Sequence, residues 1–442
     1  MQRVWLEKAL IVGVILVILK LVLMSIDGVV GERQSRQQQI VNEIASSNYG
    51  AQLYGGPVLM LPYTEEYVVL DAYKQPETRR EERILRIFPA TSSVEGEVGV
   101  GTKSRGLFKV RVFDWNARSH GEFLLRDLRV ERNRSDSKIT WGDPYISLTL
   151  GDPRGLIGAP ILKWNGQTLN FQKGSGSARP GLHAMLPAVD TSKPQRFAYD
   201  VQFTLRGTQS LAILPLADDN SFRLSSPWPH PSFGGQFLPN SDTQRVSKDG
   251  FNAQWNISSL ASAAQQQILS QGSNLDHVDR VEVRFIEPID IYSLSDRALK
   301  YGFLFILLTF CCFLLFEVLK RLLIHPAQYL MVGLALATFF LLLVALSEHV
   351  LFWIAYAGAS LACVGLLAIY LSAVLRSALR GTVFGILLTA LYGALYGLLI
   401  SEDNALLLGA ILVFAVLSLA MLATRKVDWY ALTNRAGPPV AS

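Results

Sequence analysis

The sequence is poor in cysteine. Only three of its 442 residues are cysteines, and residues 27–299 contain none. Cys311, Cys312 and Cys363 lie in apolar stretches, without a CxxC motif or a neighbouring histidine at a zinc-site spacing. This pattern excludes the common zinc sites and a disulfide framework, and it favours small packing residues in all three places.

The motifs of common hydrolases are also missing. No HExxH and no GxSxG occurs anywhere in the chain. We therefore expect no enzymatic activity, no cofactor and no metal ion. The net charge of +5 is modest and comes partly from short basic clusters beside apolar segments, which argues against a nucleic-acid partner.

Apolar residues make up half of the chain, and they are concentrated in two places. A membrane-spanning helix needs about 20 mainly apolar residues. The sequence predicts six spans, at residues 9–26, 301–319, 328–346, 351–375, 382–400 and 405–423. The first has no AxA-like cleavage site after it and is expected to be an uncleaved signal anchor. Lys20 interrupts it and is expected to reach the outer surface or face another helix.

Positive charges predict the orientation of these spans. Lysines and arginines precede the first span and follow the second, fourth and sixth, whereas the connections at 347–349 and 401–404 carry none. Both termini are therefore expected in the cytoplasm. The predicted organisation is a cytoplasmic N-terminus (1–8), a transmembrane helix (9–26), a periplasmic β-rich domain (27–299), a five-helix transmembrane bundle (300–424) and a cytoplasmic tail (425–442).

Alternating apolar residues predict the fold of the large domain. After a helix that continues outward from the first span, strand patterns appear at residues 94–100, 108–112, 146–150, 197–205 and 281–285. Such alternation is typical of antiparallel sheets with one buried face. We expect a membrane α + β protein with a β-sandwich, either as one large domain or as two packed sandwiches. A short helix is expected at residues 257–269.

Several longer strings carry a family resemblance. They are "GDPRGL" (151–156), "SPWPHPSFGGQFLP" (226–239), "SDRALKYGFLF" (295–305), "HPAQYLMVGLAL" (325–336), "LLLVALSEHV" (341–350), "DNALLLG" (403–409) and "DWYAL" (428–432). Together they make the chain resemble the inner membrane protein CreD family of bacterial cell-envelope proteins over nearly its whole length. The resemblance implies an inner-membrane location and a part in envelope integrity, stress response and colicin tolerance. It implies no catalytic residue, cofactor or substrate.

A proline- and aromatic-rich stretch at residues 225–239 is the candidate contact loop. It contains Trp228, His230, Phe233 and Phe237, and its prolines exclude a helix or a central strand. Two interpretations stay open: an ordered Ω-loop that packs its aromatic residues on the sandwich, or a surface that binds a partner.

Two short acidic turns between spans are the candidate polar cluster. Glu348 and His349 occupy one turn, and Glu402 and Asp403 the other. If the turns meet, their side chains could bind a cation, relay protons or hold a cationic ligand. Otherwise they are solvated connections. Glu317, near Lys320 at the other end of the bundle, is expected to form an interfacial salt bridge.

Small residues at every fourth position mark the fifth span. Gly381, Gly385, Gly393 and Gly397 share one helix face and form GxxxG motifs. The pattern predicts close helix packing inside the bundle, with homo-oligomerisation as the alternative. On the first interpretation, Gly393→Leu loosens the bundle.

Two functions follow from these features. The favoured one is a non-enzymatic envelope protein, surrounded by membrane lipids, whose outer domain binds a periplasmic or envelope protein partner. The alternative is a transporter or lipid-handling protein that acts through the bundle.

Overall fold

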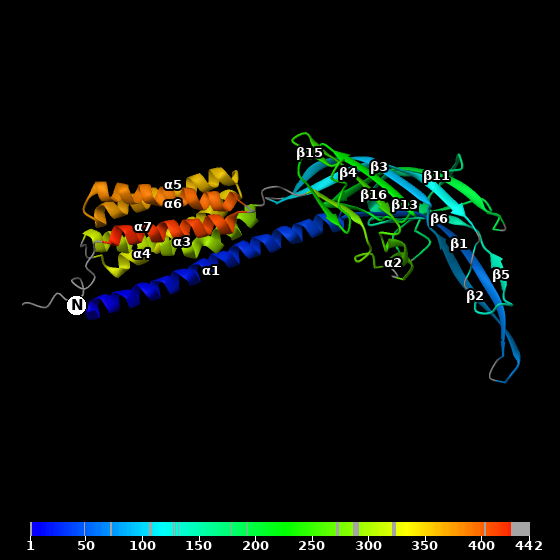
Figure 1. Ribbon diagram of the computed structural model, residues 1–442, viewed down its shortest axis with the longest axis horizontal. Coiled ribbons are helices and arrows are strands. Elements are labelled where there is room, and N and C mark those ends of the chain that lie inside the picture. The colour runs from blue at the N-terminus through cyan, green and yellow to red at the C-terminus, as the bar shows by residue number, and fades with distance from the viewer. Residues whose placement is uncertain are drawn as a thin grey trace, which may run out of the picture. The chain divides into compact units, whose positions relative to one another are not determined.

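The chain forms two compact units. The computed structural model describes residues 2–47, 49–70, 73–105, 108–126, 128, 130, 132–177, 179–191, 193–270, 274–285, 291–320, 324–401 and 404–425 (Figure 1). One unit comprises Met1–Gln38 and Ile289–Ser442, and the other comprises Gln39–Pro288. The β unit therefore begins and ends inside the boundaries of 27–299 that the sequence predicted.

Six of the helices in the described residues are long and apolar enough to cross a membrane. They are α1 (Gln2–Ser47), α3 (Ile291–Lys320), α4 (Pro326–Ser347), α5 (Phe352–Val374), α6 (Ala378–Ile400) and α7 (Ala405–Thr424). Five of the predicted spans lie within one of them, and the sixth, 351–375, exceeds α5 by one residue at each end. The His325 ring accepts a hydrogen bond from the Ala327 N–H, and Gln328 completes the capping box that starts α4.

Helix α1 packs on the bundle through large apolar side chains. Leu19 and Leu23 are buried against α3 and α4, and Gly333 gives Leu19 the space for a close approach, since a Cβ there would lie 2.2 Å from its Cδ1. The Lys20 Nζ lies 5.8 Å from the centre of the Phe303 ring. Lys20 thus faces another helix, one of the two expected arrangements.

The β unit consists of two sheets. Its strands are β1 (Gln52–Leu70), β2 (Pro76–Ile87), β3 (Thr91–Arg105), β4 (Phe108–Leu125), β5 (Lys138–Trp141), β6 (Tyr145–Leu150), β7 (Leu156–Trp164), β8 (Gln167–Asn170), β9 (Gln172–Lys173), β10 (Gly181–Met185), β11 (Gln195–Thr208), β12 (Ser210–Ile213), β13 (Asp219–Ser226), β14 (Pro231–Gly235), β15 (Arg245–Ser247), β16 (Gly250–Ser258) and β17 (Val281–Phe285). The shorter helices are η1 (Pro153–Gly155) and α2 (Ala264–Ser270).

Within the described residues, one sheet has nine strands and the other has eight. The order in the first is β14-β17-β12-β1-β6-β10-β9, with β2 and β5 paired to β1. The order in the second is β15-β16-β13-β3-β4-β11-β7-β8. Most pairs are antiparallel as expected, but β1–β12 and β3–β13 are parallel. These two pairs are formed by strands far apart in the sequence.

A single core joins the two sheets. Tyr54 of the nine-stranded sheet lies 5.8 Å from Trp115 and 5.1 Å from Phe203 of the eight-stranded sheet, measured between ring centres. All three belong to one large cluster of buried apolar residues. The β unit is therefore one sandwich, which decides between the two arrangements that the sequence left open.

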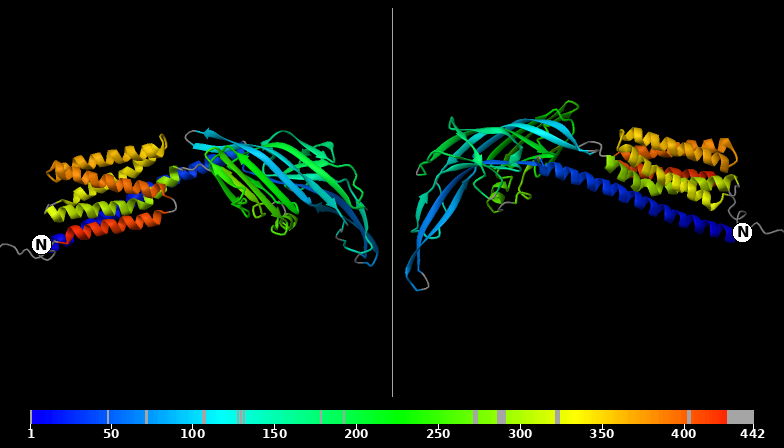
Figure 2. Two further views of the ribbon diagram at one scale, coloured as in Figure 1. Left: turned by 45° about the horizontal axis from the view of Figure 1, so that its top comes forward. Right: turned by 180° about the vertical axis from the view of Figure 1, so that it is seen from behind.

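Two local expectations need correction, and one hairpin was not expected. The helix expected at 257–269 begins only at Ala264, because Ile257 belongs to β16, where alternate residues are buried. The Ω-loop expected at 225–239 contains an edge strand, β14, which pairs with β17. The long β1–β2 hairpin, which extends beyond the other strands of its unit in both views of Figure 2, was not expected at all.

Candidate functional site

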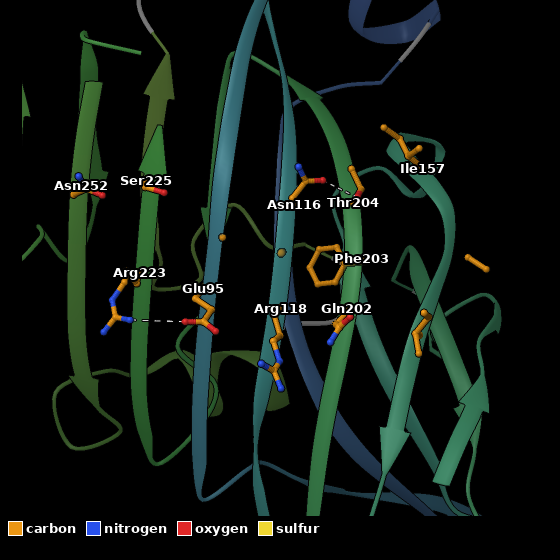
Figure 3. Close-up of a pocket in the computed structure, with 14 residues that line it drawn as sticks. Glu95, Asn116, Arg118, Ile157, Gln202, Phe203, Thr204, Arg223, Ser225 and Asn252 are labelled. Carbon is orange, nitrogen blue, oxygen red and sulfur yellow. Dashed lines mark hydrogen bonds and ion pairs between the residues drawn. The ribbon is translucent and has the colours of Figure 1, made fainter. Parts of the chain in front are cut away.

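A hollow in the outer face of the eight-stranded sheet is the principal candidate site. It has a volume of about 760 Å³ and is lined by residues of β3, β4, β7, β11, β13 and β16 (Figure 3). Arg223, Glu95, Arg118 and Gln202 stand opposite one another on neighbouring strands, so they form one row across the sheet. The sequence places them here because every second residue of these strands points away from the core.

The hollow presents charged and neutral hydrogen-bonding groups together. Arg223 and Glu95 are 3.8 Å apart, and the Thr204 hydroxyl donates to Asn116 Oδ1 at 2.8 Å (Figure 3). Exposed ion pairs of this kind contribute little to stability. The Arg223–Glu95 pair therefore adds little to the stability of the sheet.

A second ion pair on this face joins Arg118 to Asp200. The guanidinium of Arg118 hydrogen-bonds to Asp200, with the shortest contact at 2.7 Å. This hydrogen bond holds the pKa of Asp200 below its usual value, although partial burial opposes the shift. The Asp200 carboxylate is therefore ionised at neutral pH.

A second, smaller hollow lies beside the first. Its volume is about 580 Å³, and its lining includes Ser93, His120, Ser221 and Asn256. These four face one another across β3, β4, β13 and β16, in the row next to Glu95 and Arg118 along the same strands. The polar surface thus continues across the sheet beyond the first hollow.

The candidate contact loop packs on the sandwich. The Phe233 ring lies 5.6 Å from the Phe251 ring and 5.9 Å from the Trp255 ring, both of which are buried. Phe237 is also partly buried against the core, and its carbonyl accepts from Trp255 Nε1 at 3.2 Å. Packing therefore explains two of the aromatic residues that the sequence singled out.

Trp228 and His230 have a different environment. The Trp228 indole N–H donates to the His230 carbonyl at 3.0 Å, and the two rings meet edge to face at 5.8 Å. The Arg111 guanidinium carbon lies 4.5 Å above the Trp228 ring. Trp228 is half-buried and packs against the same core cluster as Phe233 and Phe237, whereas His230 is exposed. The surface that this part of the loop offers is therefore His230 and the uncovered part of the Trp228 ring.

The variants Phe233→Ala and Trp228→Ala should show which of the two aromatic residues stabilises the fold and which one belongs to the surface of the loop. We expect Phe233→Ala to lower the free energy of unfolding of the β unit by about 3 kcal/mol, because it removes a ring from the core. Trp228→Ala should cost about 1 kcal/mol, since this half-buried ring packs on the core cluster but is also covered by the exchangeable Arg111 side chain. Thermal unfolding of the purified full chain measures both. Equal losses would show that Trp228 is a core residue like Phe233.

Only Glu348 and His349 of the candidate polar cluster are among the described residues. Glu348 is nearly buried and accepts a hydrogen bond from the Tyr292 hydroxyl at 3.1 Å, and the Arg33 Nε lies 3.5 Å from the same carboxylate. Its neighbour His349 is exposed. Glu402 and Asp403 lie outside the described residues, so whether the turns meet stays a prediction. Glu348 itself links α1 to α3.

Among the described residues, no group of three or more histidine, cysteine or acidic side chains could hold a metal ion. Glu317, at the other end of the bundle, is buried and forms an ion pair with Lys8. The Tyr329 hydroxyl donates to its second oxygen at 2.7 Å. The salt bridge was expected, and the cation that the described residues supply for it is Lys8 of α1. The Lys320 side chain and Arg321 lie outside the described part of the chain.

The glycine face of α6 has two different halves. A Cβ on Gly381 would lie 1.9 Å from Ser372 Oγ, and one on Gly385 would lie 3.2 Å from the Ala368 Cβ, so both glycines pack against α5. Gly393 and Gly397 have open space in the same direction. Contrary to expectation, these two take no part in the packing of the described chain, and Gly393→Leu has nothing there to displace.

The polar rows on the sheet were not singled out from the sequence. The sequence pattern of each strand indicates only one buried and one exposed face. The sheet order then brings together the polar faces of β13, β3, β4 and β11. A signal did exist, since Glu95, Arg118 and Gln202 occupy exposed positions of alternating segments. Their register across strands is a tertiary property that the sequence alone does not supply.

Comparisons with known proteins agree with this architecture. The family model described as "Inner membrane protein CreD" matches residues 5–430. The inner membrane protein CreD of Escherichia coli (strain K12) is 35% identical over 435 residues, which cover 97% of this chain and 94% of that protein. Six apolar helices and a large β-sandwich are thus found in a chain that resembles this relative from end to end. The chain belongs to the inner membrane protein CreD family.

Proposed function

We propose that this protein is a non-enzymatic component of the bacterial envelope that helps to maintain envelope integrity. Its β unit lies in the periplasm and binds a polar envelope partner, and its helices anchor that unit in the inner membrane. The hollow in the eight-stranded sheet carries the proposal, because it gathers arginine, carboxylate, amide and hydroxyl groups on one exposed face.

The basic residues around the spans support the periplasmic location. Arg3 and Lys8 precede the first span, and Arg376 and Arg380 lie between α5 and α6. The connection at residues 347–349, at the opposite ends of the helices, has no lysine or arginine. Under the positive-inside rule, the β unit is then on the periplasmic side.

The packing of the bundle favours an anchor over a transport pathway. The Tyr392 ring lies 4.6 Å from both the Phe305 and Phe339 rings, and the Tyr356 hydroxyl donates to the Tyr392 carbonyl at 2.7 Å. Aromatic side chains from four helices thus fill the centre of the bundle. A substrate pathway through this region would have to displace them.

Complementation of a deletion strain tests the proposal. Arg118→Ala combined with Arg223→Ala removes two charged donors from the hollow, and each loss should weaken partner binding about 10- to 100-fold. We expect this variant to leave the envelope permeable to a normally excluded dye. Arg196→Ala is the matched control, because Arg196 pairs with Glu122 on the same face but does not line the hollow.

Both variants must first accumulate in the membrane at the level of the unmodified protein. Restoration of the barrier by the double variant would refute a binding role for the hollow. Failure of the Arg196 control would show that any loss of charge on this face is harmful, which also contradicts a specific site.

A further inference from the structure

Strand β2 is an edge strand of the nine-stranded sheet. Residues 63–66 of β1 pair with β2 and also with β5, so these two strands lie on opposite sides of β1 (Figure 1). Among the described residues, β2 pairs with no strand other than β1. The N–H and C=O groups of every second β2 residue therefore point away from the sheet, as in any edge strand. The proposed function makes no use of this edge.

Charged residues alternate in sign on one face of β2. Every second residue of a strand lies on the same face, and this face carries Glu77, Arg79, Glu81 and Arg83 in turn. The side chains of Glu77 and Arg79 are 53% and 59% exposed and form an ion pair at 3.5 Å. Glu81 and Arg83 form another at 2.8 Å. The exposed edge thus presents acid, base, acid and base along the strand.

This charge pattern is complementary to itself. Charges on an edge strand usually keep a second strand away. In an antiparallel pair of β2 strands centred on Arg80, however, Glu77 of one protomer stands opposite Arg83 of its partner, and Arg79 stands opposite Glu81. The two-fold axis repeats both contacts, so every acid on this face meets an arginine. Because both protomers use the same edge, the pair closes as a dimer.

Other registers of the same antiparallel pair bring like charges together. A slip of two residues is the smallest that keeps the same side chains on the same face. In one direction it places Glu81 opposite its own copy, and in the other direction Arg79 opposite its own copy. Like charges directly opposite each other are destabilising. The pattern therefore specifies one register as well as permitting the pair.

The opposite face of β2 is compatible with this register. Arg80 stands opposite its own copy there, but each Arg80 forms an ion pair with Glu66 of β1 at 2.8 Å, which compensates its charge. At each end of the pair, Ile84 stands opposite Pro76. Ile84 is 39% exposed in the single chain, so the pairing covers an apolar side chain.

We propose that two copies of this protein associate through their β2 strands, which form an antiparallel pair about a two-fold axis at Arg80. The pair joins the nine-stranded sheets of both copies into one continuous sheet. Main-chain hydrogen bonds supply the affinity, and the charged face supplies the register. The β1–β2 hairpin, which extends beyond the other strands of its unit, is then a dimerisation arm (Figure 2). The association does not require a partner in the hollow.

Cysteine cross-linking in membranes tests the register with the full chain. In a background in which serine replaces all three cysteines, Arg80→Cys places one cysteine on the expected two-fold axis. We expect oxidation to join two chains efficiently through this residue. Thr78→Cys and Glu82→Cys are the matched controls, because both residues are exposed on the same face. Each of them is expected about 14 Å along the strands from its own copy, which a disulfide cannot span.

A charge exchange tests the ionic contacts. Arg79→Glu places acids opposite each other on both sides of the axis, and Glu81→Arg does the same with arginines. Each variant alone should therefore associate at least about tenfold more weakly than the unmodified chain. When differently tagged chains carrying one substitution each are produced together, the opposite charges meet again. The two tags should then purify together as they do for unmodified chains, which also shows that both variants keep their hairpin.

Absence of cross-linking through Arg80→Cys would overturn the association. Equal cross-linking at residues 78, 80 and 82 would overturn the register and with it the two-fold pair. Failure of the two charge variants to purify together, where unmodified chains do, would show that the charged face does not direct the pairing.

Discussion

Replacing Glu317 with glutamine will destabilise the helical unit by about 3 kcal/mol. The carboxylate is 2% exposed and forms an ion pair with Lys8, whose Nζ also donates to the Ile324 carbonyl at 2.8 Å. Removal of one partner leaves the other charge buried without compensation, which costs more than the intact pair contributes. Thermal loss of helical circular dichroism in detergent measures the effect.

The double variant Lys8→Met, Glu317→Leu is the control for this experiment. It removes both charges and keeps apolar side chains of similar volume, so it should unfold closer to the unmodified protein than either single variant does. The remaining difference is the hydrogen bond that the buried Tyr329 hydroxyl loses with Glu317. Lys8→Met alone should be as harmful as Glu317→Gln, because it leaves the carboxylate buried beside Tyr329. If neither single variant lowers the melting temperature, the pair does not hold α1 to the bundle.

The membrane spans were predictable because length and hydropathy decide them, whereas the partner of Glu317 was not. A span needs only its own run of apolar residues to be recognised. The Lys8–Glu317 pair joins residues 309 positions apart in the sequence, and it depends on how α1 packs on α3 and α4. From the sequence, Lys8 was interpreted only as a sign of orientation.

The strands also divide into those that the local sequence pattern predicts and those that it does not. Strands such as β3 and β11 have one buried face, so their alternating residues predicted them correctly. The first half of β1 is buried on both faces and contains Pro57, and Pro62 follows it directly. Strand β2 is mostly exposed and charged. Neither alternates over most of its length, which explains why this hairpin was missed.

The candidate site was predicted in part. Prolines correctly excluded a central strand at residues 225–239, but they did not exclude the edge strand β14, whose Pro231 stands at its first position. The hollow was not predicted, because it consists of residues from six strands that only the sheet order brings together. The sequence could therefore identify the aromatic residues of the loop, but not the surface that supports the proposed function.

Gly381→Ala will loosen the contact between α5 and α6, whereas Gly393→Ala will not. The new methyl group at residue 381 would lie 1.9 Å from Ser372 Oγ and 2.8 Å from the Ala368 carbonyl oxygen. The hydroxyl could rotate away, but the carbonyl belongs to the backbone of α5 and cannot move without shifting the helix. Overpacking of this kind costs about 1–3 kcal/mol.

The matched comparison is on the same helix. At Gly393 nothing lies within 4 Å of the added methyl group, and alanine is the better helix former, so Gly393→Ala should unfold at the temperature of the unmodified protein or slightly above it. Thermal unfolding in detergent measures both variants. If the two unfold alike, close packing at Gly381 is not what holds α5 and α6 together. If Gly393→Ala alone destabilises the protein, a second helix must cover this half of the glycine face, and homo-oligomerisation becomes the better explanation of the motif.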